Sequence, residues 1–325
     1  MYKGIFFRKN NIFDRGDFMR IYIDGHCDTL TNTFDEKNKI SNTKYCFNTT
    51  DAKMIAPVIQ MAATFIDPKY QDGFKRANDV IDYYLENRAD TVIIKSKKDI
   101  KSVIENNKVG ILLTIENGRA IDKDLNNIDI LYEKGIRAMS INWNEDNLLG
   151  SGALTTSNLG LTNFGKSYLK KLEEKSIIID ISHSSEQTFW DAINCTTKTI
   201  VATHSCCYNL CNHPRNLKDN QIKEISKRNG IIGICFCSPF LKEYGRANVT
   251  DIIKHIAYII NLVGDDYVGL GTDFDGVLRE NTLSDIKRIR DIDILINALQ
   301  NYGYKESTIN KIMGENWLRV INSAV

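Results

Sequence analysis

The stretch IYIDGHCD, residues 21–28, distinguishes between two α/β folds that a chain of 325 residues can form, a barrel and a doubly wound open sheet. It opens with β-branched and aromatic residues, Ile21, Tyr22 and Ile23, which predict a short buried strand. In a doubly wound sheet, the first strand is followed by a glycine-rich turn of the form G-x-G-x-x-G that holds phosphate. Here a single glycine, Gly25, is followed by His26, Cys27 and Asp28. The doubly wound sheet is therefore disfavoured.

Seven further apolar runs of the same kind follow, and helical periodicity follows most of them. The eight expected strands are residues 21–24, 58–65, 109–115, 136–141, 177–181, 199–202, 231–236 and 267–271. Between two of them, Phe74, Ala77, Ile81 and Tyr84 have the spacing of a helix face, and Ser284 with Asp285 is expected to start a later helix. Eight strands with interleaved helices in about 300 residues predict a (β/α)8 TIM barrel, whose active site lies at the carboxyl ends of the strands.

One domain is expected, because only four prolines occur and the sequence contains no evident linker or repeat. We expect the barrel to span residues 21–325. Residues 1–20 have no amphipathic period, and we interpret them as an N-terminal extension that is flexible, or as an overlong start with the true start at Met19.

Charge and cysteine usage limit the class of partner. The chain has 42 basic and 41 acidic side chains, a net charge of +1, so it lacks the field that draws proteins to nucleic acid or anionic membranes. No apolar run reaches the roughly 18 residues of a membrane span. The eight cysteines have no secreted-scaffold pattern, and Cys206, Cys207 and Cys211 with His213 match no common zinc spacing. We expect free thiols, a cytoplasmic location and small-molecule partners; a homodimer is left open.

Polar side chains follow several of the expected strands at the point where each strand ends. They are His26, Asp28, Glu116, His183, His204 and Asp273. His26 and Asp28 are two residues apart, so in extended chain their side chains point the same way. A lone histidine at a strand end is more often a hydrogen-bonded structural residue than a ligand. Three of only five histidines at the same end of three strands, however, predict a metal site at the mouth of the barrel.

The number of these ligands indicates two metal ions. A catalytic zinc takes three protein ligands and keeps one open position, and three imidazoles with two carboxylates exceed that. Glu116 can bridge two ions with its two oxygens. His26 and Asp28 would then hold one ion, and His183 and His204 the other.

A set of longer motifs extends this pattern along the chain. They are IDGHCD (23–28), IENG (115–118), LTNFGKSYLKKLEEKSIIIDISHSSEQTFWD (161–191), ATHS (202–205), HPRNLKDNQIK (213–223), GLGTDFDG (269–276) and IMGENWLRVI (312–321). Together they resemble the membrane dipeptidase (renal dipeptidase) family, peptidase family M19 of the amidohydrolase superfamily. The resemblance implies a dinuclear zinc barrel that hydrolyses dipeptides, often with a D-residue at the second position, and in some members opens β-lactams.

The resemblance also implies roles for individual residues. It repeats the metal assignment above, with Glu116 and a hydroxide as the bridges between two zinc ions. Arg215 matches the arginine that holds the substrate's terminal carboxylate, for which a guanidinium offers a fixed two-donor fork. Asp273 matches the acid that handles protons and faces the substrate's amino group, and it is preferred to Asp275 because it directly follows the strand. His213 and His255 are left as structural.

Two positions depart from the family pattern. Several relatives have T-H-N where this chain has Asn142-Trp143-Asn144, and the histidine there is thought to polarise the scissile carbonyl. Trp143 has one donor and no acceptor, so it cannot do acid–base work, which puts the substrate preference in doubt. Trp143 and Asn144 are still expected to bind substrate. Cys237 stands where many relatives have a tyrosine near the substrate carboxylate.

The expected reaction is hydrolysis by metal-bound hydroxide, since two divalent ions lower the pKa of water from about 15.7 to about 7. Asp273 would carry the proton to the leaving amine. Two alternatives stay open. One is another metal-dependent hydrolase on the same barrel, acting on a lactone, a phosphoester or an N-acyl-D-amino acid. The other is a non-catalytic barrel, which the presence of every ligand disfavours.

Overall fold

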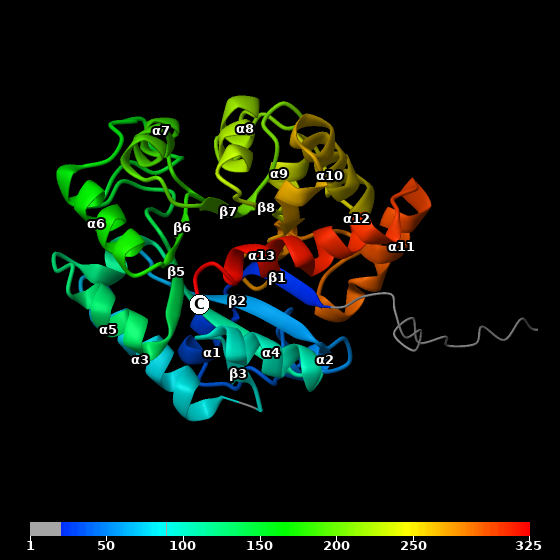
Figure 1. Cartoon of the computed structure of the whole chain (residues 1–325), viewed down its shortest axis with the longest axis horizontal. Helices are drawn as coiled ribbons and strands as arrows, with labels where there is room; N and C mark the ends of the chain where they lie inside the picture. The colour runs from blue at the N-terminus through cyan, green and yellow to red at the C-terminus, as the bar shows by residue number, and fades with distance from the viewer. Residues whose placement is uncertain (1–20, 89) are drawn as a thin grey trace, which may run out of the picture.

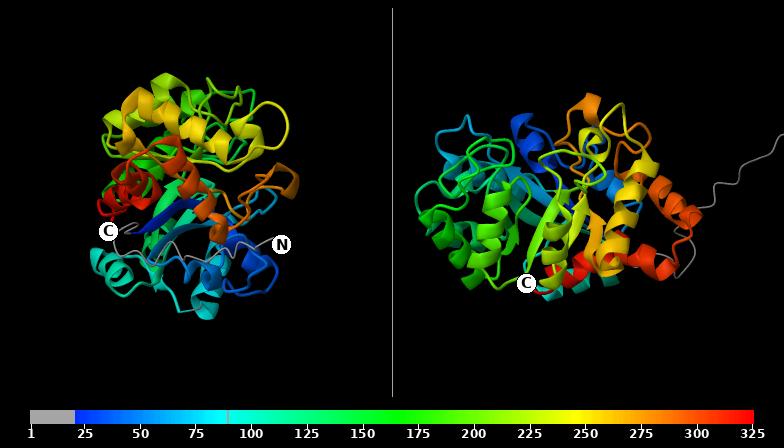
Figure 2. Two further views of the ribbon diagram at one scale, coloured as in Figure 1. Left: turned by 90° about the vertical axis from the view of Figure 1, so that its right-hand side faces the viewer. Right: turned by 90° about the horizontal axis from the view of Figure 1, so that it is seen from above.

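The run that begins at Ile21 forms the first strand of a closed parallel barrel in the computed structural model, which describes residues 21–88 and 90–325. Figure 1 shows helices surrounding these strands, and Figure 2 shows the molecule from two further sides. The prediction of a (β/α)8 TIM barrel is confirmed. The predicted extension at residues 1–20, with Met19, lies outside the described residues.

All eight expected strands are present. They are β1 Tyr22–Cys27, β2 Val58–Phe65, β4 Val109–Glu116, β5 Ile136–Ser140, β6 Ile178–Asp180, β7 Ile200–Ser205, β8 Ile232–Ile234 and β9 Val268–Leu270. Around the barrel the order is β2, β1, β9, β8, β7, β6, β5, β4, and pairing of β2 with β4 closes the ring. A two-residue strand that was not predicted, β3 Val92–Ile93, pairs with β4 at Gly110 and Ile111.

The helices lie outside the barrel or across its ends. They are α1 Thr29–Asp35, α2 Thr49–Ala52, α3 Gly73–Asn87, α4 Lys97–Glu105, α5 Asn127–Lys134, α6 Asn163–Glu174, α7 Glu186–Cys195, α8 Asp219–Lys227, α9 Ser238–Leu241, α10 Val249–Val263, α11 Asp293–Tyr302, α12 Glu306–Asn310 and α13 Asn316–Ile321. Among the described residues, no helix is long and apolar enough to cross a membrane.

The expected helix start at Ser284 is wrong, because α11 begins only at Asp293. Both residues of the expected start serve α10 instead. The hydroxyl and the amide of Ser284 donate to the carbonyl of Ala247, and a carboxylate oxygen of Asp285 accepts from the amide of Val249 at 3.0 Å. They therefore satisfy backbone groups at the beginning of a neighbouring helix.

One end of the barrel is closed by the C-terminal helix, and this leaves the other end for the site. Trp317 of α13 is fully buried and donates its indole N–H to the carbonyl of Leu270 at 2.8 Å. It packs in one cluster with Ile21 and Ile231, which stand at or just before the amino ends of their strands. Figure 1 shows α13 lying across the centre of the ring. The carboxyl ends of the strands open on the opposite side.

Candidate metal centre

The six polar residues predicted from the strand ends meet at the carboxyl end of the barrel. His26, Glu116 and His204 lie in β1, β4 and β7. Asp28 directly follows β1, and His183 and Asp273 lie three residues beyond the ends of β6 and β9. Five of the six are buried, with at most 8% of their surface exposed, and Asp273 is half-buried. Two groups of three potential ligands have their ligand atoms within 4.8 Å of one another: His26, Glu116, His204 and His26, Asp28, Asp273.

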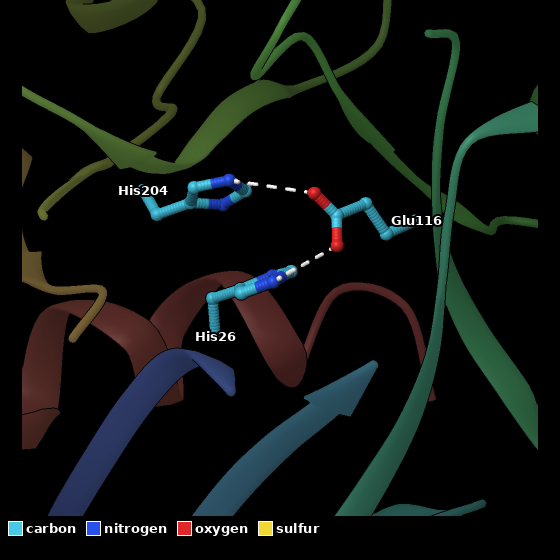
Figure 3. A group of neighbouring side chains, drawn as sticks. All are labelled: His26, Glu116 and His204. Carbon is cyan, nitrogen blue, oxygen red and sulfur yellow. Dashed lines mark ion pairs between the residues drawn. The ribbon is translucent and has the colours of Figure 1, made fainter. Parts of the chain in front are cut away.

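Glu116 lies between histidines from different strands. Its Oε1 is 2.9 Å from Nε2 of His183 and 3.8 Å from Nε2 of His204. Its Oε2 is 3.4 Å from Nε2 of His26. Figure 3 shows the carboxylate with one oxygen toward His204 and the other toward His26. The two oxygens thus face two separate groups of ligands, as a bridging carboxylate must.

Hydrogen bonds behind the rings assign the protons of two histidines. Nδ1 of His183 is 2.8 Å from the side-chain oxygen of Asn144, which can only accept. Nδ1 of His204 is 2.8 Å from the hydroxyl of Thr203, and that hydroxyl donates its own proton to Asp180 at 2.6 Å. Both imidazoles therefore carry the proton on Nδ1, and both Nε2 atoms are bare.

These two bare nitrogens face each other. Nε2 of His183 and Nε2 of His204 are 2.7 Å apart, and burial, with the charge of Arg215 or of His26 nearby, lowers the pKa of both rings. Neutral rings leave two lone pairs in contact, which is repulsive unless a cation binds between them. The residues present therefore fit a metal ion, and Asn144 and Thr203 orient its ligands.

On the other side of Glu116, three carboxylates surround the ring of His26. Nε2 of His26 is buried without a hydrogen-bond partner, and it lies 3.4 Å from Asp28 and 3.9 Å from Asp273. Burial lowers the pKa of His26, but the facing carboxylates of Glu116 and Asp28 outweigh burial and raise it well above its ordinary value. Three carboxylates with one imidazole are a donor set for a hard or borderline divalent cation.

The structure distinguishes Asp273 from Asp275, because the two side chains make different contacts. Asp273 has a positive φ of 59°, its Oδ1 faces His26, and its Oδ2 accepts from the thiol of Cys235 at 3.6 Å. Burial, opposed by His26 and helped by the charges of Asp28 and Glu116, raises the pKa of Asp273 to about 8. Asp275 instead accepts from Thr29 at 2.5 Å and from the amides of Cys46 and Phe47. Asp275 therefore fixes the segments of Thr29 and of Cys46 and Phe47, whereas Asp273 faces the candidate metal ligands.

Arg215 lies next to the centre, beside β7. Its side chain is 4% exposed and donates from Nη2 to the carbonyl of His204 at 3.2 Å. The guanidinium lies 5.4 Å from the centre of the Phe240 ring, and its backbone amide donates to Nδ1 of His213 at 3.1 Å. Arg215 and His183 line a polar cavity of about 260 Å³. This hydrogen bond joins the ring of His213 to the backbone of the loop that carries Arg215.

A second cavity, of about 340 Å³, lies over the ligands. Asp28, Glu116, His183 and Asp273 line it, and so do Trp143 and Asn144, which the sequence indicated. Phe65 and Phe240 add aromatic walls that sequence reasoning missed. Phe65 is the last residue of an expected strand, and this position could have indicated that it lies at the mouth of the barrel.

A (β/α)8 barrel that gathers buried histidines and carboxylates at the carboxyl ends of its strands has the architecture of a metal-dependent hydrolase. Residues 19–325 match the family described as membrane dipeptidase, peptidase family M19. The chain belongs to this family, and it is a hydrolase of the metallo-dipeptidase class.

The chain is also similar to individual proteins in sequence or in fold. An uncharacterized protein in the pqqA 5' region of Klebsiella pneumoniae is 34% identical over 238 residues, which cover 70% of this chain and 87% of that protein. A metallo peptidase from Rhodobacter sphaeroides, liganded with a phosphinate mimic of the dipeptide L-Ala-D-Ala, has a similar fold, with a TM-score of 0.85 and 21% identity over 95% of this chain and all of the other. A dipeptidase AC of family M19 gives a TM-score of 0.85 with 22% identity over 95% and 99% of the two chains.

Proposed function

We propose that this chain is a dinuclear dipeptidase that holds two divalent metal ions, with zinc expected. His26 and Asp28 would hold one ion, His183 and His204 the other, and Glu116 would bridge them. The observation that carries the proposal is the approach of the Nε2 atoms of His183 and His204 to 2.7 Å, beside one oxygen of a carboxylate whose other oxygen faces His26. When bound, such ions acidify water and polarise a carbonyl.

The chain's own residues supply proton transfer and substrate orientation. Asp273 faces the ligands with Oδ1, so it can take the proton of the attacking water and return it to the leaving amine. In its ionised form the Asp273 carboxylate also suits the ammonium group of a dipeptide. Arg215 would bind the terminal carboxylate through its guanidinium. A longer peptide has no free carboxylate one residue beyond the scissile bond, so Arg215 would limit substrates to dipeptides.

Stereochemistry at the second position is the next part of the proposal. We include dipeptides with a C-terminal D-residue among the substrates. The support is the Rhodobacter sphaeroides structure of the same fold, which is liganded with a mimic of L-Ala-D-Ala.

The test is metal analysis of the purified protein together with hydrolysis of L-Xaa-L-Xaa and L-Xaa-D-Xaa dipeptides. We expect about two divalent ions per chain and activity that chelation abolishes and metal restores. Lactones, phosphoesters and N-acyl-D-amino acids belong in the same panel. Turnover of one of these without dipeptide hydrolysis would overturn the substrate assignment, and turnover of nothing in the panel would favour a non-catalytic barrel.

A cytoplasmic location also remains part of the proposal. All eight cysteines lie in the described part of the chain, and each is free, which suits a reducing compartment. Two of the thiols of the disfavoured zinc set donate to backbone carbonyls, Cys207 to His255 and Cys211 to Pro239. A homodimer is proposed only as the assembly to test first, by measuring the mass in solution.

A further inference from the structure

The candidate substrate site is made of two cavities that share His183: Arg215 lines the cavity of about 260 Å³, and Phe65 and Trp143 line the cavity of about 340 Å³. The order of strands places them at two opposite ends of the barrel mouth. Arg215 is bonded to the carbonyl of His204 in β7. Starting from β7, strand β2 is reached after four steps in either direction around the ring. The carboxyl end of β2 therefore lies across the mouth of the barrel from Arg215, with the metal ligands of β1, β4 and β6 between them.

An aromatic pair occupies that opposite end. Phe65 is the last residue of β2, and its ring centre lies 5.3 Å from that of Trp143 in the loop after β5, at an interplanar angle of 56°. Both side chains are half-buried and line the 340 Å³ cavity. Trp143 also lies 6.2 Å from the ring of His183. The pair thus presents a continuous aromatic surface at the edge of the metal centre.

The charges between the two ends fix the direction in which a dipeptide can lie. Asp28 follows β1 and is next to the end formed by β2, whereas Asp273 follows β9, midway between β2 and β7. Both line the 340 Å³ cavity, and in their ionised forms both attract an ammonium group. Arg215 at the other end attracts a carboxylate. A dipeptide held by its carboxylate at Arg215 and by its ammonium group at Asp28 would therefore have its first residue on the side of Phe65 and Trp143.

We infer that Phe65 and Trp143 form the subsite for the side chain of the N-terminal residue, and that the chain prefers dipeptides whose first residue is large and apolar. This inference rests on the proposed function. The preference follows from burial of apolar side-chain surface against two aromatic rings. Near Arg215 a single aromatic ring, Phe240, lines the cavity, so less aromatic surface faces the second residue than the first.

The isomers Leu-Gly and Gly-Leu test the inference, because they contain the same atoms and differ only in which residue carries the side chain. With the metal-loaded full-length protein, we expect kcat/KM for Leu-Gly to exceed that for Gly-Leu by about tenfold or more, the discrimination that apolar pockets provide. Phe65→Ala should lower kcat/KM for Leu-Gly by about tenfold and change that for Gly-Leu by less than about twofold.

Matched variants guard against indirect effects. Trp143→Ala should repeat the selective loss, and Phe65→Leu should retain most of the preference. Phe240 lies beside Arg215, and Phe240→Ala should lower kcat/KM for both isomers by similar factors. Metal content is measured for each protein, because Phe65 pairs in register with Glu116. Equal losses for both isomers in Phe65→Ala and Trp143→Ala, or a selective loss for Gly-Leu, would overturn the subsite while leaving the dipeptidase proposal intact. Wild-type protein that cleaves neither isomer nor any other dipeptide would overturn both.

Discussion

The side-chain oxygen of Asn144 lies 2.8 Å from Nδ1 of His183 and holds the proton of that ring on the side away from Glu116. His183 also has a positive φ of 67°, so its position depends on its surroundings more than on local backbone preference. The contact makes Asn144 an orienting residue for a metal ligand as well as part of the cavity wall.

Replacing Asn144 with leucine removes the acceptor but keeps the approximate size of the side chain. The Nε2 atom can then carry the proton and lose its lone pair for the metal. We expect metal affinity and activity to fall together by about 10–100-fold, the usual effect of losing such a partner. Metal titration and kcat/KM measure the two losses, and Asn144→Asp, which keeps an acceptor, is the control. Full metal affinity in Asn144→Leu would contradict the orienting role.

Cys235 is expected to position Asp273 through the thiol that points to its Oδ2 at 3.6 Å. Cys235→Ala should lower kcat by about tenfold while metal content and KM change little, since the hydrogen-bond partners of residues at a metal site contribute about 10–100-fold. Cys235→Ser keeps a donor and should recover most of the activity. Cys195→Ala, which removes an exposed thiol at the end of α7, controls for the loss of any thiol. A Cys235→Ala enzyme with wild-type kcat would rule out positioning by Cys235.

Arg215→Ala should raise KM for dipeptides by about 100-fold, because a hydrogen-bonded pair between charged groups contributes roughly 1.5–3 kcal/mol. Arg215→Lys keeps the charge but loses the fork, so we expect an intermediate KM. The sharper comparison uses dipeptide amides, which lack the carboxylate: wild type and Arg215→Ala should hydrolyse them equally poorly. An unchanged KM for free dipeptides would remove Arg215 from the substrate site.

The parts of the structure that could be predicted are those that depend on local patterns of neighbouring residues. Apolar runs identified eight strands, and chain order then placed His26, Glu116, His183 and His204 at one end of the barrel. The two-residue strand β3 is too short to leave a periodic pattern.

The contacts that depend on tertiary packing could not be predicted from local sequence patterns. The pairing of Phe65 with Trp143 joins residues 78 positions apart (143 minus 65) through the closure of the ring. The contact of Cys235 with Asp273 joins two strand ends that are adjacent only in the folded barrel. Ser284 has the local pattern of a helix start, but its hydroxyl bonds to Ala247.

His255 predicts a pH dependence of stability that is separate from the metal centre. The ring is fully buried in α10, where Nδ1 accepts from the amide of Cys207 and Nε2 donates to the carbonyl of Leu241, both at 3.0 Å. Burial lowers the pKa of His255, so the folded state keeps the ring neutral while the unfolded chain binds a proton near pH 6.5. Stability from this residue is therefore present above about pH 6.5 and is lost as the pH falls below it.

The variant His255→Gln, with one amide donor and one acceptor, isolates this contribution because the other four histidines are unchanged. Between about pH 6.5 and 5, the free energy of unfolding should fall more steeply for the wild type than for the variant, since only the wild type gains a proton at residue 255 on unfolding. Urea unfolding at a series of pH values, with both proteins in the same metal state, measures the difference. Parallel curves across this range would show that His255 is protonated equally in both states. The two hydrogen bonds would then have to rearrange, because a doubly protonated ring cannot accept from Cys207.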